Sequence, residues 1–245
     1  MADEIFEDPR LASLYDPLHS DRDDLDAYLA MVAEFGARRV LDIGCGTGVF
    51  ALLLADRGID VTGVDPAGAS IDVARGKPGG DRVRWIHGDA TAVPVSPPPG
   101  FDLATMTANA AQQITDDPGW AATLRAARAA LRPGGRFVFE TRDPARRAWE
   151  AWNRTESYEV VSVPGVGEIE SWYDVLDVTE PLVTFRQTLI FRASGDVLTS
   201  DSTLRFRSRD ELAADLAAAG FPGHEIRDAP DRPGREFVVV AERPR

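Results

Sequence analysis

The sequence Val40-Leu41-Asp42-Ile43-Gly44-Cys45-Gly46-Thr47-Gly48 decides the fold, because a short apolar strand runs there into a glycine-rich bend. A helix is predicted directly after the bend, over 49–57, and Gly58 ends it. Only glycine lets the backbone turn sharply at positive φ and approach a ligand with no side chain in the way. This strand, bend and helix therefore predict a ligand-binding α/β unit.

Strand and helix patterns alternate around this unit. Strands are predicted over 59–64, 83–87, 101–106 and 136–141. Helices are predicted over 21–35, 69–75 and 118–131, and the prolines of segment 92–100 predict a loop. Such alternation favours an α/β fold with a doubly wound, mostly parallel seven-stranded sheet and helices on both faces.

The pattern changes after residue 150. Consecutive strands are predicted over 158–163, 168–178, 182–193 and 199–207, and their short turns require antiparallel pairing. A helix over 208–219 and strands over 224–227 and 237–241 then complete the first sheet. We therefore predict an α/β domain, residues 1–150 and 208–245, interrupted by an antiparallel sheet, residues 151–207, that forms a substrate lid or a dimerisation surface.

Composition and charge exclude several classes of partner. The chain of 245 residues has a formal net charge of −13, which would repel a nucleic acid. No apolar run approaches the roughly 20 residues that span a bilayer, and the first residues lack a signal-peptide pattern. Since the single cysteine, Cys45, allows no intrachain disulfide, we expect a cytoplasmic protein that acts on small molecules.

The bend distinguishes between nucleotide ligands. A dinucleotide fingerprint needs a third glycine where this chain has Val49, and no lysine follows the bend as in a phosphate-binding loop. Asp42 stands at the entrance of the bend, where its charge would repel a pyrophosphate and attract a cation. These residues favour a cationic nucleoside over NAD or a nucleoside triphosphate.

Two further acidic residues end the next two strands. Asp65 closes the strand over 59–64 and can accept hydrogen bonds from both hydroxyls of a ribose, which serves NAD equally well. Asp89 follows the strand over 83–87, so it would lie beside the same pocket and could receive an adenine amino group. We expect these carboxylates and Asp42 to meet at one edge of the sheet.

The order and spacing of these motifs carry a family resemblance. Segment 40–48 resembles the first motif of class I, Rossmann-like S-adenosylmethionine-dependent methyltransferases, Gly63-Val64-Asp65-Pro66 the second, and Gly88-Asp89-Ala90 the third. Phe101-Asp102-Leu103-Ala104 is similar to the fourth strand of that family, and Leu131-Arg132-Pro133-Gly134-Gly135-Arg136 to the turn into its fifth. The inserted strands resemble the substrate lid of small-molecule members such as sugar N-methyltransferases.

The resemblance implies S-adenosylmethionine as cofactor and methyl transfer to a small-molecule nitrogen, oxygen or carbon. It implies that Met106 and Thr107 lie near the sulfonium and that Tyr15 closes over the cofactor. The implied cofactor-binding residues are Tyr15, Asp42, Gly44, Cys45, Gly46, Asp65, Pro66, Asp89, Ala90, Met106 and Thr107.

Two residues are predicted to contact the substrate. Arg142 follows the fifth strand, at the edge where α/β sheets bind ligands, and its fork suits a carboxylate or phosphate. Trp172 belongs to the aromatic part of the insert. We assign no metal ligand and no general base, because methyl transfer depends mainly on alignment and a dry pocket. The alternatives are a protein that binds the cofactor without turnover and an NAD-dependent oxidoreductase.

Overall fold

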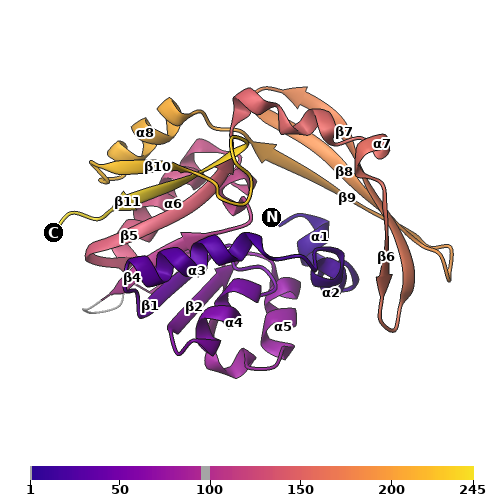
Figure 1. Ribbon diagram of the computed structural model, residues 1–245, viewed down its shortest axis with the longest axis horizontal. Coiled ribbons are helices and arrows are strands. Elements are labelled where there is room, and N and C mark those ends of the chain that lie inside the picture. Colours follow the sequence, from indigo (N-terminus) through magenta and orange to yellow (C-terminus); the bar gives the residue numbers. More distant parts are fainter. Residues whose placement is uncertain (1, 95–99) are drawn as a thin grey trace.

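Two β-sheets organise the protein (Figure 1), whose computed structural model describes residues 2–94 and 100–245. The first sheet has seven strands in the order β10-β11-β5-β4-β1-β2-β3, and the second has four in the order β6-β7-β8-β9. The predicted fold class, a mostly parallel α/β sheet with a separate antiparallel sheet, is therefore confirmed. Most of the predicted loop over 92–100 lies outside the described residues.

Strands β1 to β5 of the first sheet run parallel, whereas β11 pairs antiparallel with both β5 and β10. Its strands are β1 (Arg39–Ile43), β2 (Asp60–Asp65), β3 (Arg84–His87), β4 (Phe101–Met106), β5 (Leu131–Arg142), β10 (His224–Asp228) and β11 (Glu236–Glu242). Strand β5 begins five residues before the predicted start at Arg136, because Leu131 already pairs with Phe101 on β4.

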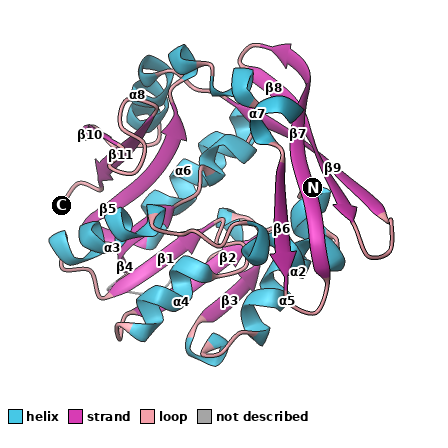
Figure 2. Ribbon diagram, turned by 45° about the vertical axis from the view of Figure 1, so that its right-hand side comes forward, coloured by secondary structure: helices cyan, strands magenta, loops and turns pink. Residues whose placement is uncertain are grey.

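Helices cover both faces of this sheet (Figure 2). They are α3 (Asp24–Glu34), α4 (Val49–Asp56), α5 (Gly68–Gly76), α6 (Asp117–Ala130) and α8 (Arg209–Ala218). Helix α8 starts with the reciprocal hydrogen bonds of a capping box between Ser208 and Glu211. Short 3-10 turns join the elements: η1 (Gly80–Arg82), η2 (Ala90–Ala92), η3 (Ala110–Gln113), η4 (Pro144–Arg146) and η5 (Ala148–Ala151).

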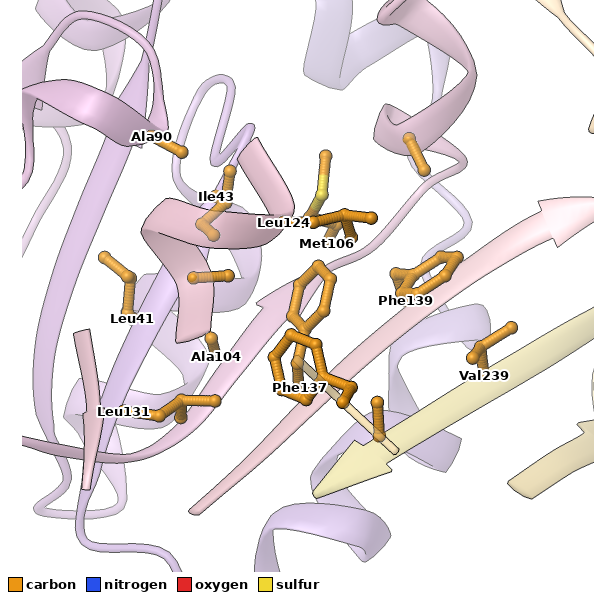
Figure 3. Packing of buried hydrophobic residues seen from close by; sticks show 14 of the residues in the cluster. Leu41, Ile43, Ala90, Ala104, Met106, Leu124, Leu131, Phe137, Phe139 and Val239 are labelled. Carbon is orange, nitrogen blue, oxygen red and sulfur yellow. The ribbon is translucent and has the colours of Figure 1, made fainter. Parts of the chain in front are cut away.

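Alternating side chains of the parallel strands form two cores. Phe137 and Phe139 of β5 pack with Met106 of β4 and Leu124 of α6 on one face (Figure 3). Val138 between them faces the opposite core, with the buried residues of α3 and α4. Burying one such large apolar side chain contributes about 1.5–3 kcal/mol, so these cores hold the carboxyl ends of the strands in place.

The second sheet is antiparallel throughout, and it falls within the predicted insert. Its strands are β6 (Glu159–Val163), β7 (Gly167–Thr179), β8 (Leu182–Phe191) and β9 (Val197–Arg205), and the one-turn helix α7 (Arg154–Ser157) precedes them. Pairs such as Ile169 with Phe191 face inward, because side chains alternate between the faces of a strand.

The first helices of the chain connect the two sheets (Figure 1). Helices α1 (Glu4–Glu7) and α2 (Pro9–Leu18) pack apolar side chains against the inner face of the second sheet. On their other side, Glu7 accepts a hydrogen bond from the Gly68 amide at the start of α5 (2.7 Å). Helix α1 was not predicted, because its four residues are too few to show a period.

Candidate functional site

The bend after β1 needs its glycines for two different reasons. Gly44, Gly46 and Gly48 all have positive φ angles, of 71°, 52° and 80°. A Cβ on Gly44 would lie 2.8 Å from the Ala110 side chain, so packing forbids one there. A Cβ on Gly46 would meet no atom of the described residues within 4 Å. The backbone at Gly46 is therefore open to a ligand.

Asp42 places an unsatisfied carboxylate oxygen beneath this bend. The side chain is 1% exposed, and its Oδ1 accepts a hydrogen bond from the Thr105 hydroxyl (3.0 Å). The other oxygen, Oδ2, has no partner among the described residues. Burial raises the pKa of Asp42 to about 7; the Thr105 bond and Arg22 act in the opposite direction, and Asp65 adds to the rise. A bound cation would satisfy this group.

Asp65 holds the bend from the neighbouring strand. Its Oδ2 accepts the Gly46 amide and its Oδ1 accepts the Ala67 amide, each at 2.8 Å. Burial raises the pKa of Asp65, and these two hydrogen bonds oppose that rise. Each carboxylate oxygen can accept a second hydrogen bond, so the arrangement still allows a ribose diol.

The ends of β2 and β3 lie side by side, because Asp65 is paired in register with His87. Pro66 follows Asp65, and its carbonyl accepts a hydrogen bond from the His87 ring at 3.0 Å. Asp89 is exposed after β3 and accepts the Thr91 amide at 2.8 Å. The next residue, Ala90, is buried in the core. The structure thus brings Asp42, Asp65 and Asp89 to the same edge of three adjacent strands.

Cys45 is an enclosed part of the bend. The side chain is buried, and burial raises the pKa of its thiol well above the usual value. A Cβ on Gly63 would lie 2.9 Å from its Sγ, so the thiol fills the gap above a glycine of β2. A protonated, enclosed thiol is a poor nucleophile, and Cys45 contributes packing and backbone.

The turn after β4 is strained and lies against the bend. Met106 and Thr107 are buried, and the next two residues, Ala108 and Asn109, have left-handed φ angles of 54° and 58°. Such angles are costly outside glycine, so the surroundings must impose them. The following residue, Ala110, is the one that approaches Gly44.

Two buried carboxylates impose this turn. Glu140 of β5 accepts the Asn109 amide (3.1 Å) and the Tyr28 hydroxyl, while Glu236 of β11 accepts the Asn109 side-chain amide (2.9 Å). Burial raises the pKa of Glu140 to about 7, with Glu236 adding to the rise. This network was not predicted, because a single glutamate in a strand carries no local sign that it is buried.

Helix α2 is bound to the glycine bend. Asp16 accepts a hydrogen bond from the Thr47 hydroxyl and forms an ion pair with Lys77, which also donates to the Thr47 carbonyl (2.6 Å). Tyr15 precedes Asp16, and its ring stacks on His19 with 4.5 Å between centroids. The predicted closing residue, Tyr15, is therefore next to a contact with the bend.

Arg142 lies at the carboxyl end of β5, as predicted. Its Nη1 donates to Gln112 Oε1 (2.9 Å), its Nε lies 3.5 Å from Glu236, and its guanidinium lies 5.5 Å from the Trp152 ring centroid. Burial lowers the pKa of Arg142, and the neighbouring Glu236 opposes that effect.

The structure does not bring Trp172 to this group. Its indole donates to Asp174 (2.7 Å) and lies beneath Arg154, at 4.3 Å, on the outer face of the second sheet. Side chains alternate along a strand, so the next residue, Tyr173, faces inward and contacts Phe185 at 5.7 Å. Tyr173, and not Trp172, is thus the aromatic residue of β7 that faces inward.

A family model described as a methyltransferase domain matches residues 40–135, which include the bend, Asp65, Asp89 and the turn after β4. Residues 40–135 thus resemble a methyltransferase domain. The predicted resemblance to the class I family is confirmed over this part of the sequence. No group of acidic, histidine or cysteine side chains in residues 2–94 and 100–245 is arranged to hold a metal ion.

Curated methyltransferases match about half of the chain. A ubiquinone biosynthesis O-methyltransferase of Saccharophagus degradans is 31% identical over 130 residues, 52% of this chain and 53% of that protein. The chain thus spans about half the length of the relatives it matches.

Solved structures extend the likeness to the whole fold. The CcbJ methyltransferase of Streptomyces caelestis has a TM-score of 0.72 and 22% identity, covering 92% of this chain and 91% of that one. CalS10 of Micromonospora echinaspora, an amino pentose methyltransferase solved with S-adenosylmethionine, has a TM-score of 0.69 and 22% identity, covering 94% and 96%. The first and second sheets therefore follow a known arrangement.

Proposed function

We propose that this protein is an S-adenosylmethionine-dependent methyltransferase that acts on a small molecule. The observation that carries the proposal is the buried Asp42 Oδ2, which has no partner in the described chain and lies beneath a bend that is open at Gly46. An amino-acid ammonium is the group that such an oxygen lacks. The methyltransferase domain match and the S-adenosylmethionine in CalS10 support the same ligand.

The residues at this edge fit each part of the cofactor. Asp42 and the open backbone at Gly46 suit the methionine portion, Asp65 suits the ribose, and the neighbouring Asp89 suits the adenine. Exclusion of water would fall to the side chains around Thr107 and to Tyr15. The proposed binding set is Tyr15, Asp42, Gly44, Cys45, Gly46, Asp65, Pro66, Asp89, Ala90, Met106 and Thr107.

The chemistry requires alignment of two reactants. The bound sulfonium supplies an activated methyl group: the acceptor lone pair forms the new bond to carbon while the sulfur–carbon electron pair returns to sulfur. The chain orients the acceptor and excludes water, and good orientation of two reactants is worth roughly 7–11 kcal/mol. Two buried carboxylates, Glu140 and Glu236, hold the turn at Asn109, and this turn forms one edge of the site.

Assembly and location complete the proposal. We propose that residues 151–207 act as a lid over the acceptor, because their inner face meets Tyr15 and the other apolar residues of α1 and α2. Dimerisation through the same sheet is the alternative role. Among the described residues no helix is long and apolar enough to cross a membrane. The cytoplasmic location rests on the single cysteine, which is buried and free.

Binding of the cofactor tests the proposal directly. Calorimetric titration should show that S-adenosylmethionine and S-adenosylhomocysteine bind and that NAD does not. Gly46→Ala should weaken S-adenosylmethionine binding by about tenfold or more, since a methyl group then enters the open cradle. Gly36→Ala is the matched control, because Gly36 also has a positive φ and an open Cβ position but lies before β1. Equal weakening in both variants, or heat with NAD alone, would refute the proposed cofactor.

Turnover separates an enzyme from a protein that only binds the cofactor. Release of S-adenosylhomocysteine should be measured with a panel of phenols, amines, sugars and carboxylates. Release that depends on an acceptor supports the enzyme, whereas tight binding without release for every class favours the non-catalytic alternative.

A further inference from the structure

A continuous row of flat side chains joins the end of β5 to the inner face of the second sheet. The Arg142 guanidinium lies 5.5 Å from the Trp152 ring, and Trp152 lies 4.8 Å from Phe185. Phe185 in turn lies 5.7 Å from Tyr173. The rings of Trp152 and Phe185 are tilted by 57° and those of Phe185 and Tyr173 by 71°, and all three are partly exposed, so an aromatic ligand can pack against them edge to face.

Three hydrogen-bond donors in this region are not used within the part of the chain that the structure describes. Arg142 Nη2 and the hydroxyls of Tyr15 and Tyr173 have no partner within residues 2–94 and 100–245, yet none of them is among the buried unpartnered atoms. These atoms therefore reach accessible space. Arg142 can only donate hydrogen bonds.

These donors affect one another's pKa values. Burial raises the pKa of Tyr173 to about 12; Tyr15 and Glu159 add to the rise, and Arg142 opposes it. Arg142 also opposes the rise in the pKa of Tyr15, whose first cause is again burial. Both tyrosines thus keep their protons at neutral pH, and both can donate to an anion.

The carboxylates beside Arg142 are already engaged. Glu236 accepts hydrogen bonds from Asn109 and from Arg232 (2.8 Å), and Glu140 accepts them from Asn109 and Tyr28. A cationic acceptor would therefore gain little here. Besides Asp42, the buried carboxylate oxygen that lacks a partner among the described residues is Asp3 Oδ2, which a cationic acceptor could use instead; the Asp3 side chain also contacts Ser202 of β9.

From these contacts we propose that the methyl acceptor is a planar, aromatic molecule with a carboxylate group, which Arg142, Tyr15 and Tyr173 bind. The carboxylate lies against Arg142 Nη2, and the ring lies along Trp152 and Phe185. The methylated atom is then a different part of the same molecule. This inference rests on the proposed methyltransferase function.

Three matched probes distinguish a carboxylate from other groups. The protein is saturated with S-adenosylhomocysteine and titrated calorimetrically with 4-hydroxybenzoate, 4-hydroxybenzyl alcohol and tyramine. Hydrogen bonds to a charged group contribute about 1.5–3 kcal/mol, so 4-hydroxybenzoate should bind about tenfold or more tightly than either of the others.

Variants then assign the contacts. Arg142→Gln should remove the preference for the carboxylate, and Tyr173→Phe should weaken the binding of 4-hydroxybenzoate several-fold. Arg154→Gln is the control, because Arg154 lies over Trp172 on the outer face and should leave binding unchanged. Thermal melting and S-adenosylhomocysteine affinity report whether each variant folds. If Arg142→Gln does not fold, the result with Tyr173→Phe decides the test.

The outcomes separate this inference from the proposed function. Failure of S-adenosylhomocysteine to bind overturns the methyltransferase assignment itself. If it binds, then equal or tighter binding of tyramine or the alcohol overturns only the acceptor class. The acceptor class is also overturned if 4-hydroxybenzoate does not bind at millimolar concentration. It is overturned as well if Asp3→Asn abolishes acceptor binding and Arg142→Gln does not.

Discussion

Replacement of Asp42 by asparagine should stabilise the ligand-free protein and weaken its binding of S-adenosylmethionine. Asp42 is 1% exposed, and its pKa of about 7 lies well above the ordinary value of 3.8. Because each pH unit of this rise is worth about 1.4 kcal/mol, the ionised carboxylate costs the empty fold on the order of 4 kcal/mol at pH 8. Asparagine removes this charge but leaves part of its amide unpaired, at a cost of about 1–3 kcal/mol.

The net gain at pH 8 is therefore about 2 kcal/mol, or about 4–8 °C in Tm for a protein of this size. The sign with pH follows from the raised pKa. The folded state holds the Asp42 proton more tightly than the unfolded state, so the wild-type protein loses stability as pH rises from about 4 to about 7. The advantage of Asp42→Asn should consequently shrink on acidification and vanish near pH 5.

Thermal melts at pH 5 and pH 8, with calorimetry for S-adenosylmethionine, measure both effects. Asp102→Asn is the matched control. Burial acts to raise the pKa of Asp102, but hydrogen bonds from Arg132 and from the amides of Arg38 and Arg39 lower it overall. This variant should destabilise at pH 8 and leave cofactor affinity unchanged. A lower Tm for Asp42→Asn at pH 8, or a difference that is the same at both pH values, would refute the reasoning.

Two other contacts lead to further expectations. Lys77→Ala removes the cation that binds Asp16 and the Thr47 carbonyl. Limited proteolysis should then cut α2 faster, and stopped-flow measurements should show faster dissociation of S-adenosylmethionine. Unchanged rates would show that this contact does not hold the helix. Tyr28→Phe removes the hydroxyl that donates to the buried Glu140, so denaturant unfolding should show that the free energy of unfolding falls by about 1–3 kcal/mol. An unchanged free energy of unfolding would mean that water takes the place of the hydroxyl.

The sequence was sufficient for the architecture because its signals are local. Apolar strands, glycine stops and the change of pattern after residue 150 each act over a few residues, and the structure confirms the strands and both sheets that they predict. The carboxyl ends of adjacent parallel strands must meet, so the positions of Asp42, Asp65 and Asp89 followed from order alone. The position of Arg142 at the carboxyl end of β5 followed from the same argument.

Other parts of the site depend on which way a side chain faces and on distant partners. Trp172 and Tyr173 are neighbouring aromatic residues of one strand, and nothing in their own segment says which of them faces inward. The contact of Asp16 with Lys77 joins elements about sixty residues apart, and Glu140 becomes buried only when α3 and β11 cover it. Such features require the folded chain.

The position of the first helices has a consequence for biosynthesis. The Ile5 amide donates to the Ser200 hydroxyl, a contact that spans 195 residues, and the apolar residues of α1 and α2 pack on strands made late in translation. During synthesis these helices leave the ribosome long before their partners exist. These two helices thus acquire their native surroundings only after β6 to β9 have been made, and during that interval their apolar side chains depend on chaperones or transient contacts for protection.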